Sequence, residues 1–131
     1  MGTFVTPLLE GREPYDIYRW ARQLFEERDH LAAIEALEYL LDRAPDSELG
    51  ETRELLARAY YHSAQLDKAA AAARELLAKD PDQGYAALLL YRSLVRAGRR
   101  EEAERARLWA IALGMDVSGR QTLDEADSTA E

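Results

Sequence analysis

One pattern of small and large side chains recurs along this chain. Ala33, Ala69 and Ala103 are separated by 36 and 34 residues, and Pro45 and Pro81 are again 36 residues apart. Each alanine follows a short polar or glycine-containing break, and each break follows an apolar run. Such periods are typical of stacked arrays, in which neighbouring units share a core that no unit could bury alone. The repeat therefore predicts a stack of similar units.

Larger apolar side chains within each unit recur with helical spacing. They stand thirteen and nine residues before the alanines, as the pairs Trp20 and Leu24, Leu56 and Tyr60, and Leu90 and Leu94. An offset of four residues places the two members of a pair on one face of a helix. The pattern predicts an all-α chain of six helices, at about 15–28 with 31–43, 48–63 with 67–79, and 83–97 with 100–113.

The breaks set the expected domain boundaries. Three helical hairpins are predicted at 14–46, 47–81 and 82–115, after a leader segment at 1–13. Pro45 and Pro81 end the first two hairpins, and Gly98 marks the turn inside the third. Residues 116–131 carry five acids against Arg120 and few large apolar side chains, so we expect an acidic, flexible tail.

The middle unit, LLARAYYHSAQLDKAAAAARELLAKDP, resembles a tetratricopeptide repeat, the helix-turn-helix unit of protein-binding solenoids. Its signature places hold Leu56, Ala57, Tyr60, Ala69, Leu76 and Pro81. The first unit matches with Trp20, Ala21, Leu24, Ala33 and Pro45, and the third with Leu90, Leu94, Gly98, Ala103 and Ala110. The third unit departs at Tyr91, where a small residue is expected, and at Met115, where proline is expected. The resemblance covers about residues 14–115 and implies a small three-repeat member with a right-handed solenoid fold.

Composition argues against several kinds of chemistry. The chain has no cysteine, which excludes disulfides, thiolate metal sites and thiol catalysis. His30 and His62 lack metal-ligand spacing, and no glycine-rich phosphate loop occurs. Ser63 is adjacent to His62, and neighbouring helical residues point about 100° apart, so the two cannot form a nucleophilic pair. We therefore predict a protein that is not an enzyme and needs no cofactor or metal.

Net charge and residue usage limit the possible partners and the cellular location of the protein. The net charge of −8 argues against nucleic acid or an anionic membrane as the main partner. The N-terminal sequence lacks the features of a signal peptide, and no apolar run is long enough for a membrane helix. Arginine far outnumbers lysine, and asparagine is absent, which suggests a GC-rich bacterial genome. A cytoplasmic location is the prediction.

In the family that this chain resembles, the first helix of each hairpin lines a concave groove. Arg22, Arg58 and Arg92 each lie eleven residues before a signature alanine, and we expect them to form a ladder along that groove. The flanking side chains are expected to be Tyr18, Phe25, Tyr61, His62, Tyr85 and Val95. Arginine binds carboxylates through a planar fork, and aromatic rings provide flat apolar anchors. The sequence therefore predicts a groove for an acidic or carboxylate-bearing peptide, the alternative being a solvated face.

A second hypothesis is structural. The last predicted helix carries Leu108, Trp109 and Ile111 in addition to its alanines, which is more apolar surface than one hairpin partner can cover. We expect the surplus to meet either the apolar leader, which contains Phe4, Val5, Pro7, Leu8 and Leu9, or the same face of another copy. A weak homodimer, or a scaffold that assembles through the solenoid ends, is thus the alternative to peptide binding.

Overall fold

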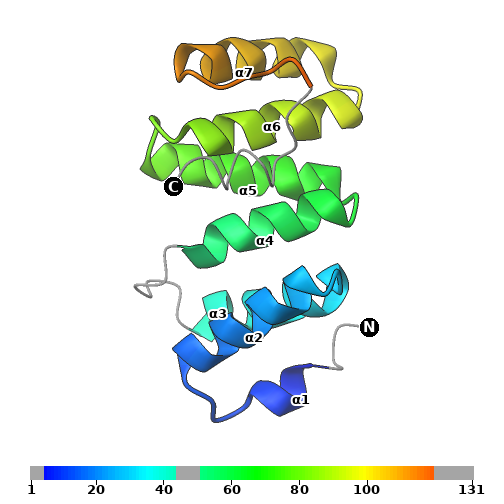
Figure 1. Ribbon diagram of the computed structural model, residues 1–131, viewed down its shortest axis with the longest axis vertical. Helices are drawn as coiled ribbons and strands as arrows, with labels where there is room; N and C mark the ends of the chain where they lie inside the picture. The colour runs from blue at the N-terminus through cyan, green and yellow to red at the C-terminus, as the bar shows by residue number, and fades with distance from the viewer. Residues whose placement is uncertain (1–4, 44–50, 120–131) are drawn as a thin grey trace. The chain divides into compact units, whose positions relative to one another are not determined.

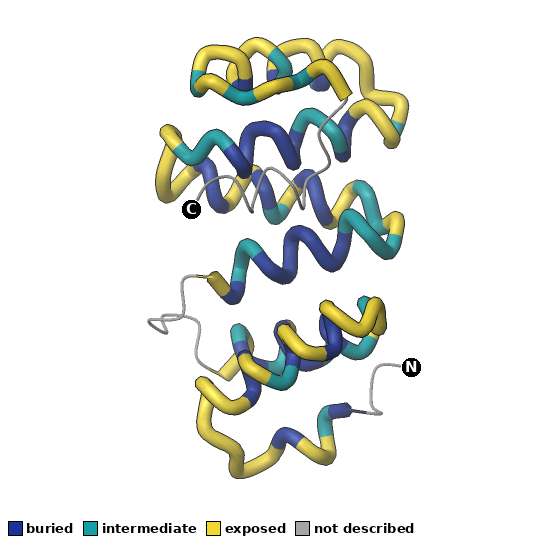
Figure 2. The backbone as a smooth tube through the Cα atoms, in the orientation of Figure 1, coloured by how far each residue is buried: buried dark blue, intermediate teal, exposed yellow. Residues whose placement is uncertain are grey.

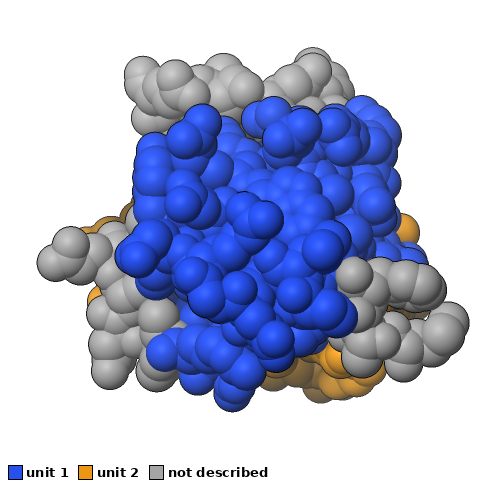
Figure 3. Space-filling view, turned by 90° about the horizontal axis from the view of Figure 1, so that it is seen from below, with its two compact units in different colours: residues 1–64 blue, residues 65–131 orange. Residues whose placement is uncertain are grey.

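The computed structural model describes residues 5–43 and 51–119, and these residues form seven helices and no strand (Figure 1). The chain divides into two compact units, residues 1–64 (unit 1) and residues 65–131 (unit 2), which Figure 3 colours separately. Pro45 and residues 120–131, to which the sequence assigned a turn and most of a flexible tail, lie outside the described residues.

Unit 1 contains four helices, α1 (Thr6–Leu9), α2 (Pro14–Glu26), α3 (His30–Arg43) and α4 (Glu51–His62). The buried positions of α2 recur at intervals of three and four, which gives this helix one apolar face; they are Ile17, Tyr18, Ala21, Leu24 and Phe25. That helix packs against α3 and also contacts α4, while α3 contacts both α1 and α4. The signature alanine Ala33 is fully buried, as close helix packing requires.

Unit 2 contains α5 (Leu66–Lys79), α6 (Gly84–Arg96) and α7 (Arg100–Ala112). The middle helix α6 packs against both α5 and α7, and Figure 1 shows it between them. Six consecutive α6 residues, Tyr85–Leu90, are therefore buried, and the tube of α6 is dark over this stretch in Figure 2. The neighbours present small side chains to α6, since α5 buries Ala69, Ala70 and Ala73 and α7 buries Ala103, Ala106 and Ala110.

The repeat is also visible in the backbone. Arg28, Ala64 and Gly98 are 36 and 34 residues apart, and all three have φ between 63° and 77°. In each case the amide donates to the carbonyl three residues earlier at 3.0 Å, which closes the helix end. The turn predicted at Gly98 is therefore present, and two non-glycine residues adopt the same left-handed conformation.

The leader contains a short helix, α1, that the sequence did not predict. Its Val5 and Leu9 are buried, and α1 packs against α3. One carboxylate oxygen of Glu35 on α3 accepts hydrogen bonds from the Val5 amide (3.0 Å), the Thr6 amide (2.8 Å) and the Thr6 hydroxyl (2.8 Å). Val5 and Leu9 thus add to the core of unit 1, whereas Leu8 is exposed.

The second predicted hairpin is divided between the two units. Of the segment 47–81, α4 belongs to unit 1 and α5 belongs to unit 2. Helices of neighbouring predicted hairpins pack together, since α3 contacts α4 and α5 contacts α6. Packing of this kind is what a stacked array requires. The division into three hairpins at 14–46, 47–81 and 82–115 stays a prediction.

Candidate functional site

A polar row on α2 begins the candidate site in unit 1. Arg22 donates a hydrogen bond from Nη1 to the Tyr18 hydroxyl at 3.2 Å, and its Nε lies 3.5 Å from a Glu26 carboxylate oxygen. Burial raises the pKa of Tyr18, Arg22 works to lower it, and the nearby Glu51 and Glu54 carboxylates raise it further. The Tyr18 end of this face therefore meets the acidic start of α4.

An aromatic cluster forms the other end of the same face. The Phe25 ring of α2 lies edge-on to the imidazoles of His30 (5.1 Å between centroids) and His62 (5.7 Å). The two imidazoles are stacked on each other at 5.3 Å with an interplanar angle of 18°. The Arg58 guanidinium carbon lies 4.7 Å from the Phe25 ring centroid, a cation–π distance. The cluster thus joins the ends of α2 and α4 to the start of α3.

The predicted site residues of unit 1 lie on these helices, and we call them with His30 the α2–α4 surface: Tyr18, Arg22, Phe25, His30, Arg58, Tyr61 and His62. Their exposure differs sharply, and the Tyr18 and Phe25 side chains are buried. The Arg22 side chain is 49% exposed, whereas Arg58 is only 8% exposed. Tyr61 and His62 are half-buried. The alternative of a solvated face does not fit Arg58, because its guanidinium packs over Phe25 inside the aromatic cluster. A role of Arg58 in binding stays a prediction.

His30 is the residue of this surface that the sequence pattern did not indicate. The pattern placed it in a turn, but it is the first residue of α3 and follows the left-handed turn at Arg28. The backbone amide of Ala32 donates to Asp29 Oδ1 at 3.3 Å, which helps to fix the start of the helix. Only the repeat could have predicted the contact between His30 and His62. In a stack of repeats, the turn of one hairpin lies near a helix of the next.

The remaining predicted groove residues, Tyr85, Arg92 and Val95, all lie on α6 in unit 2. Tyr85 is buried, Arg92 is half-buried and Val95 is 51% exposed. Since Arg22 and Arg58 lie in unit 1 and Arg92 lies in unit 2, the three-rung arginine ladder stays a prediction.

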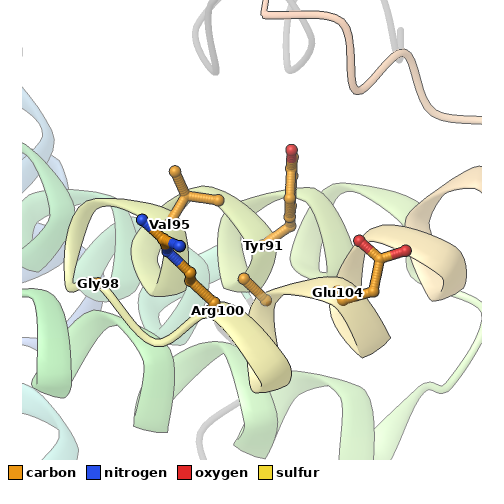
Figure 4. A pocket seen from close by; sticks show the side chains of 6 residues that line it. Tyr91, Val95, Gly98, Arg100 and Glu104 are labelled. Carbon is orange, nitrogen blue, oxygen red and sulfur yellow. The ribbon is translucent and has the colours of Figure 1, made fainter.

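A hollow of about 410 Å³ opens between α6 and α7. Its lining residues are Tyr91, Val95, Gly98, Arg100, Ala103 and Glu104. Figure 4 shows Tyr91 and Val95 projecting from α6 on one side, with Arg100 and Glu104 contributed by α7. A second hollow of about 300 Å³ in unit 1 is lined by Leu8, Arg12, Asp16 and Trp20.

The side chains predicted for self-association are exposed on α7. Leu108 is 55% exposed and Ile111 is 45% exposed. Trp109 is less exposed, and its indole N–H donates to the Pro81 carbonyl at 3.1 Å. The outer face of α7 therefore presents apolar surface, whereas Val5 and Leu9 of the leader are already buried in unit 1.

The ranges 5–43 and 51–119 contain no cluster of three or more His, Asp or Glu side chains arranged to hold a metal ion. Among the helices of this part of the chain, none has the length and apolar character to cross a membrane.

A family model described as tetratricopeptide repeat matches residues 9–120, which is most of the chain. Searches of curated proteins and of solved structures found no match. Repeats of this type are typically non-catalytic modules for protein–protein interaction. The all-helical fold, the recurring turns and the matched range show that this chain belongs to the tetratricopeptide repeat family.

Proposed function

We propose that the α2–α4 surface binds a partner protein through an acidic or carboxylate-bearing segment, and that the chain acts as a non-catalytic adaptor. The observation that carries the proposal is the aromatic cluster, in which Arg58 and two stacked imidazoles surround Phe25. Aromatic rings and arginine are the side chains that most often dominate the binding energy of protein interfaces.

The charges along the α2–α4 surface favour one end, the end near His62, for the carboxylate of the partner segment. Glu51 and Glu54 act on the Tyr18 hydroxyl at the start of α4, and they would repel an acidic ligand there. Arg58 lies about one to two turns further along the same helix, and His62 lies about two to three turns further along. The carboxylate would therefore bind between Arg22 and His62, with an apolar neighbour in the segment packing on Tyr61.

The buried arginine and the exposed arginine have different roles in this proposal. Arg58 supports the Phe25 ring and contributes positive potential from within the cluster. Arg22 is half-exposed and can exchange its 3.5 Å contact with Glu26 for a partner carboxylate. Such an exchange replaces one exposed ion pair by another, so the gain must come from desolvation and from the adjacent rings.

Display of a random peptide library to the immobilised full chain tests the proposal, because the library samples acidic and neutral segments alike. We expect the recovered peptides to carry Asp or Glu next to an apolar residue. Arg22→Glu and His62→Glu should each weaken their binding about tenfold or more, because a charge-assisted hydrogen bond contributes about 1.5–3 kcal/mol. Arg105→Glu, on the exposed part of α7, is the matched control and should leave binding unchanged. Peptides without acids, or binding that ignores both changes, would refute the proposal.

A second candidate function is self-assembly through α7. Leu108 and Ile111 are three residues apart on α7 and both exposed, and contiguous exposed apolar surface is uncommon on monomeric proteins, which favours self-assembly. The burial of Val5 and Leu9 in unit 1 also removes two of the leader side chains that could have covered this face.

A further inference from the structure

The exposed face of α6 in unit 2 combines a cation with an apolar hollow. Arg92 Nη2 is buried and has no hydrogen-bond partner among residues 5–43 and 51–119. Val95 is half-exposed and lines the hollow together with Tyr91 and Ala103. Arg100 lies on the rim, and the Glu104 carboxylate beside it is engaged by Arg107 at 2.6 Å. We call Tyr91, Arg92 and Val95 of α6, together with Arg100 at the start of α7, the α6 face.

The chain leaves α7 toward this same face. After α7 the Gly114 amide donates to the Ile111 carbonyl and the Met115 amide to the Ala110 carbonyl, both at 2.9 Å, and Gly114 has φ 85°. This reversal brings Met115 onto Gly84, where an added Cβ would lie 2.8 Å from the Met115 sulfur. Gly84 precedes Tyr91 by seven residues and Val95 by eleven, so the three positions share one side of α6. Met115 therefore marks one end of the face.

The acidic segment is long enough to extend from Met115 along the α6 face, and its composition suits that face. Leu123 follows Met115 by eight residues, which can span about 27 Å when extended. Gly84 and Val95 are separated by a helical rise of about 16 Å. Leu123 is the large apolar residue of the segment 120–131, and Asp124 and Glu125 follow it directly. The order of an apolar side chain and then two carboxylates matches a hollow that is lined by Tyr91, Val95 and Arg100, with Arg92 next to Tyr91 on α6.

We propose that residues 120–127 bind along the α6 face of their own chain. Leu123 enters the hollow lined by Tyr91, Val95 and Ala103, and the carboxylates of Asp124 and Glu125 bind Arg92 and Arg100. Because the segment is tethered, its effective concentration is in the millimolar range, and a weak contact is enough to occupy the face. The bound segment excludes other acidic ligands from unit 2 and leaves the α2–α4 surface of unit 1 for the partner.

A spin label on the segment tests this directly, because the chain has no cysteine and Ser128→Cys creates a unique attachment site. In the full-length protein, a nitroxide at position 128 should broaden the amide resonances of Tyr91, Arg92 and Val95. The broadening should be lost in Arg92→Glu/Arg100→Glu and in Leu123→Ser. Arg105→Glu, in the same unit, is the matched control and should keep the broadening.

Two results would overturn the proposal. One is broadening of the α6 face that is no stronger than that of exposed α5 residues, or that persists in Arg92→Glu/Arg100→Glu. The other is broadening of an isotope-labelled chain by a separate spin-labelled copy, which would show contact between molecules. Partial recovery on combining Arg92→Glu with Asp124→Arg would support it. Peptide binding to the α2–α4 surface is measured separately, so failure of this proposal is distinguishable from failure of the proposed function.

Discussion

In unit 1, two arginines at equivalent positions of the repeat have different surroundings. Arg22 and Arg58 occupy equivalent places before Ala33 and Ala69, yet one is half-exposed and the other is buried over an aromatic ring. The repeat phase identifies which helix face a side chain occupies. It does not identify whether a neighbouring ring covers that side chain, because the ring comes from a different helix.

Charge reversal should therefore affect the two arginines differently. We expect Arg58→Glu to lower the free energy of unfolding by about 2–4 kcal/mol, because it replaces a buried cation–π contact with a carboxylate over the Phe25 ring. Arg22→Glu should change it by less than about 0.5 kcal/mol, since the side chain is half-exposed. Urea denaturation followed by circular dichroism measures both. Equal stabilities of the two variants would show that the packing over Phe25 contributes little.

At the scale of helices, the sequence predicts most of the architecture and less of the site. Periodic alanines and apolar pairs determine where α2 to α7 occur, because close helix packing demands small side chains at fixed intervals. The sequence did not predict the short helix α1, because four residues are too few to show a helical period. The residue that anchors it, Glu35, is also distant in sequence. The sequence also did not predict the stacking of His30 on His62, because these residues lie on two different helices and no local pattern relates them.

The anchor of α1 should respond to acid. Partial burial works to raise the pKa of Glu35, but the hydrogen bonds from Thr6 and Val5 outweigh it and lower the pKa below its ordinary value of 4.5. A lowered pKa in the folded state means that the anchor stabilises α1 above pH 4.5 and that this contribution is lost as the pH falls through the folded-state pKa.

NMR of the full chain checks this expectation. The amide resonances of Val5 and Thr6 should shift with a midpoint below pH 4.5, and Glu35→Gln should abolish the transition. Glu27→Gln removes an exposed carboxylate of the same unit and is the control. A midpoint above 4.5, or an unchanged transition in Glu35→Gln, would contradict the assignment to Glu35.

At the scale of the whole molecule, α7 either ends the structure or joins two copies. Apolar surface at Leu108 and Ile111 favours association, yet one helix face is small compared with the roughly 1,200–2,000 Å² that a stable interface buries. A contact of this size would give a weak dimer that forms only as concentration rises.

Light scattering across a concentration series should show the mass of the chain increasing toward that of a dimer. Leu108→Glu/Ile111→Glu should keep the chain monomeric throughout, because it places charges in the apolar contact. Leu31→Glu changes an apolar side chain that is 68% exposed in unit 1, and it should leave the dimer intact. A monomer at all concentrations would eliminate self-assembly as the alternative function.

The three left-handed turns have a consequence for the order of folding. Gly98 adopts positive φ with little steric cost, whereas a residue with a Cβ, such as Arg28 or Ala64, loses about 1–2 kcal/mol in the same conformation. Closing the turn between α6 and α7 is thus the least expensive of the three closures. On the cost of these turns alone, we expect folding to start most easily at the α6–α7 hairpin, and helices added later would extend an existing surface instead of nucleating a new one.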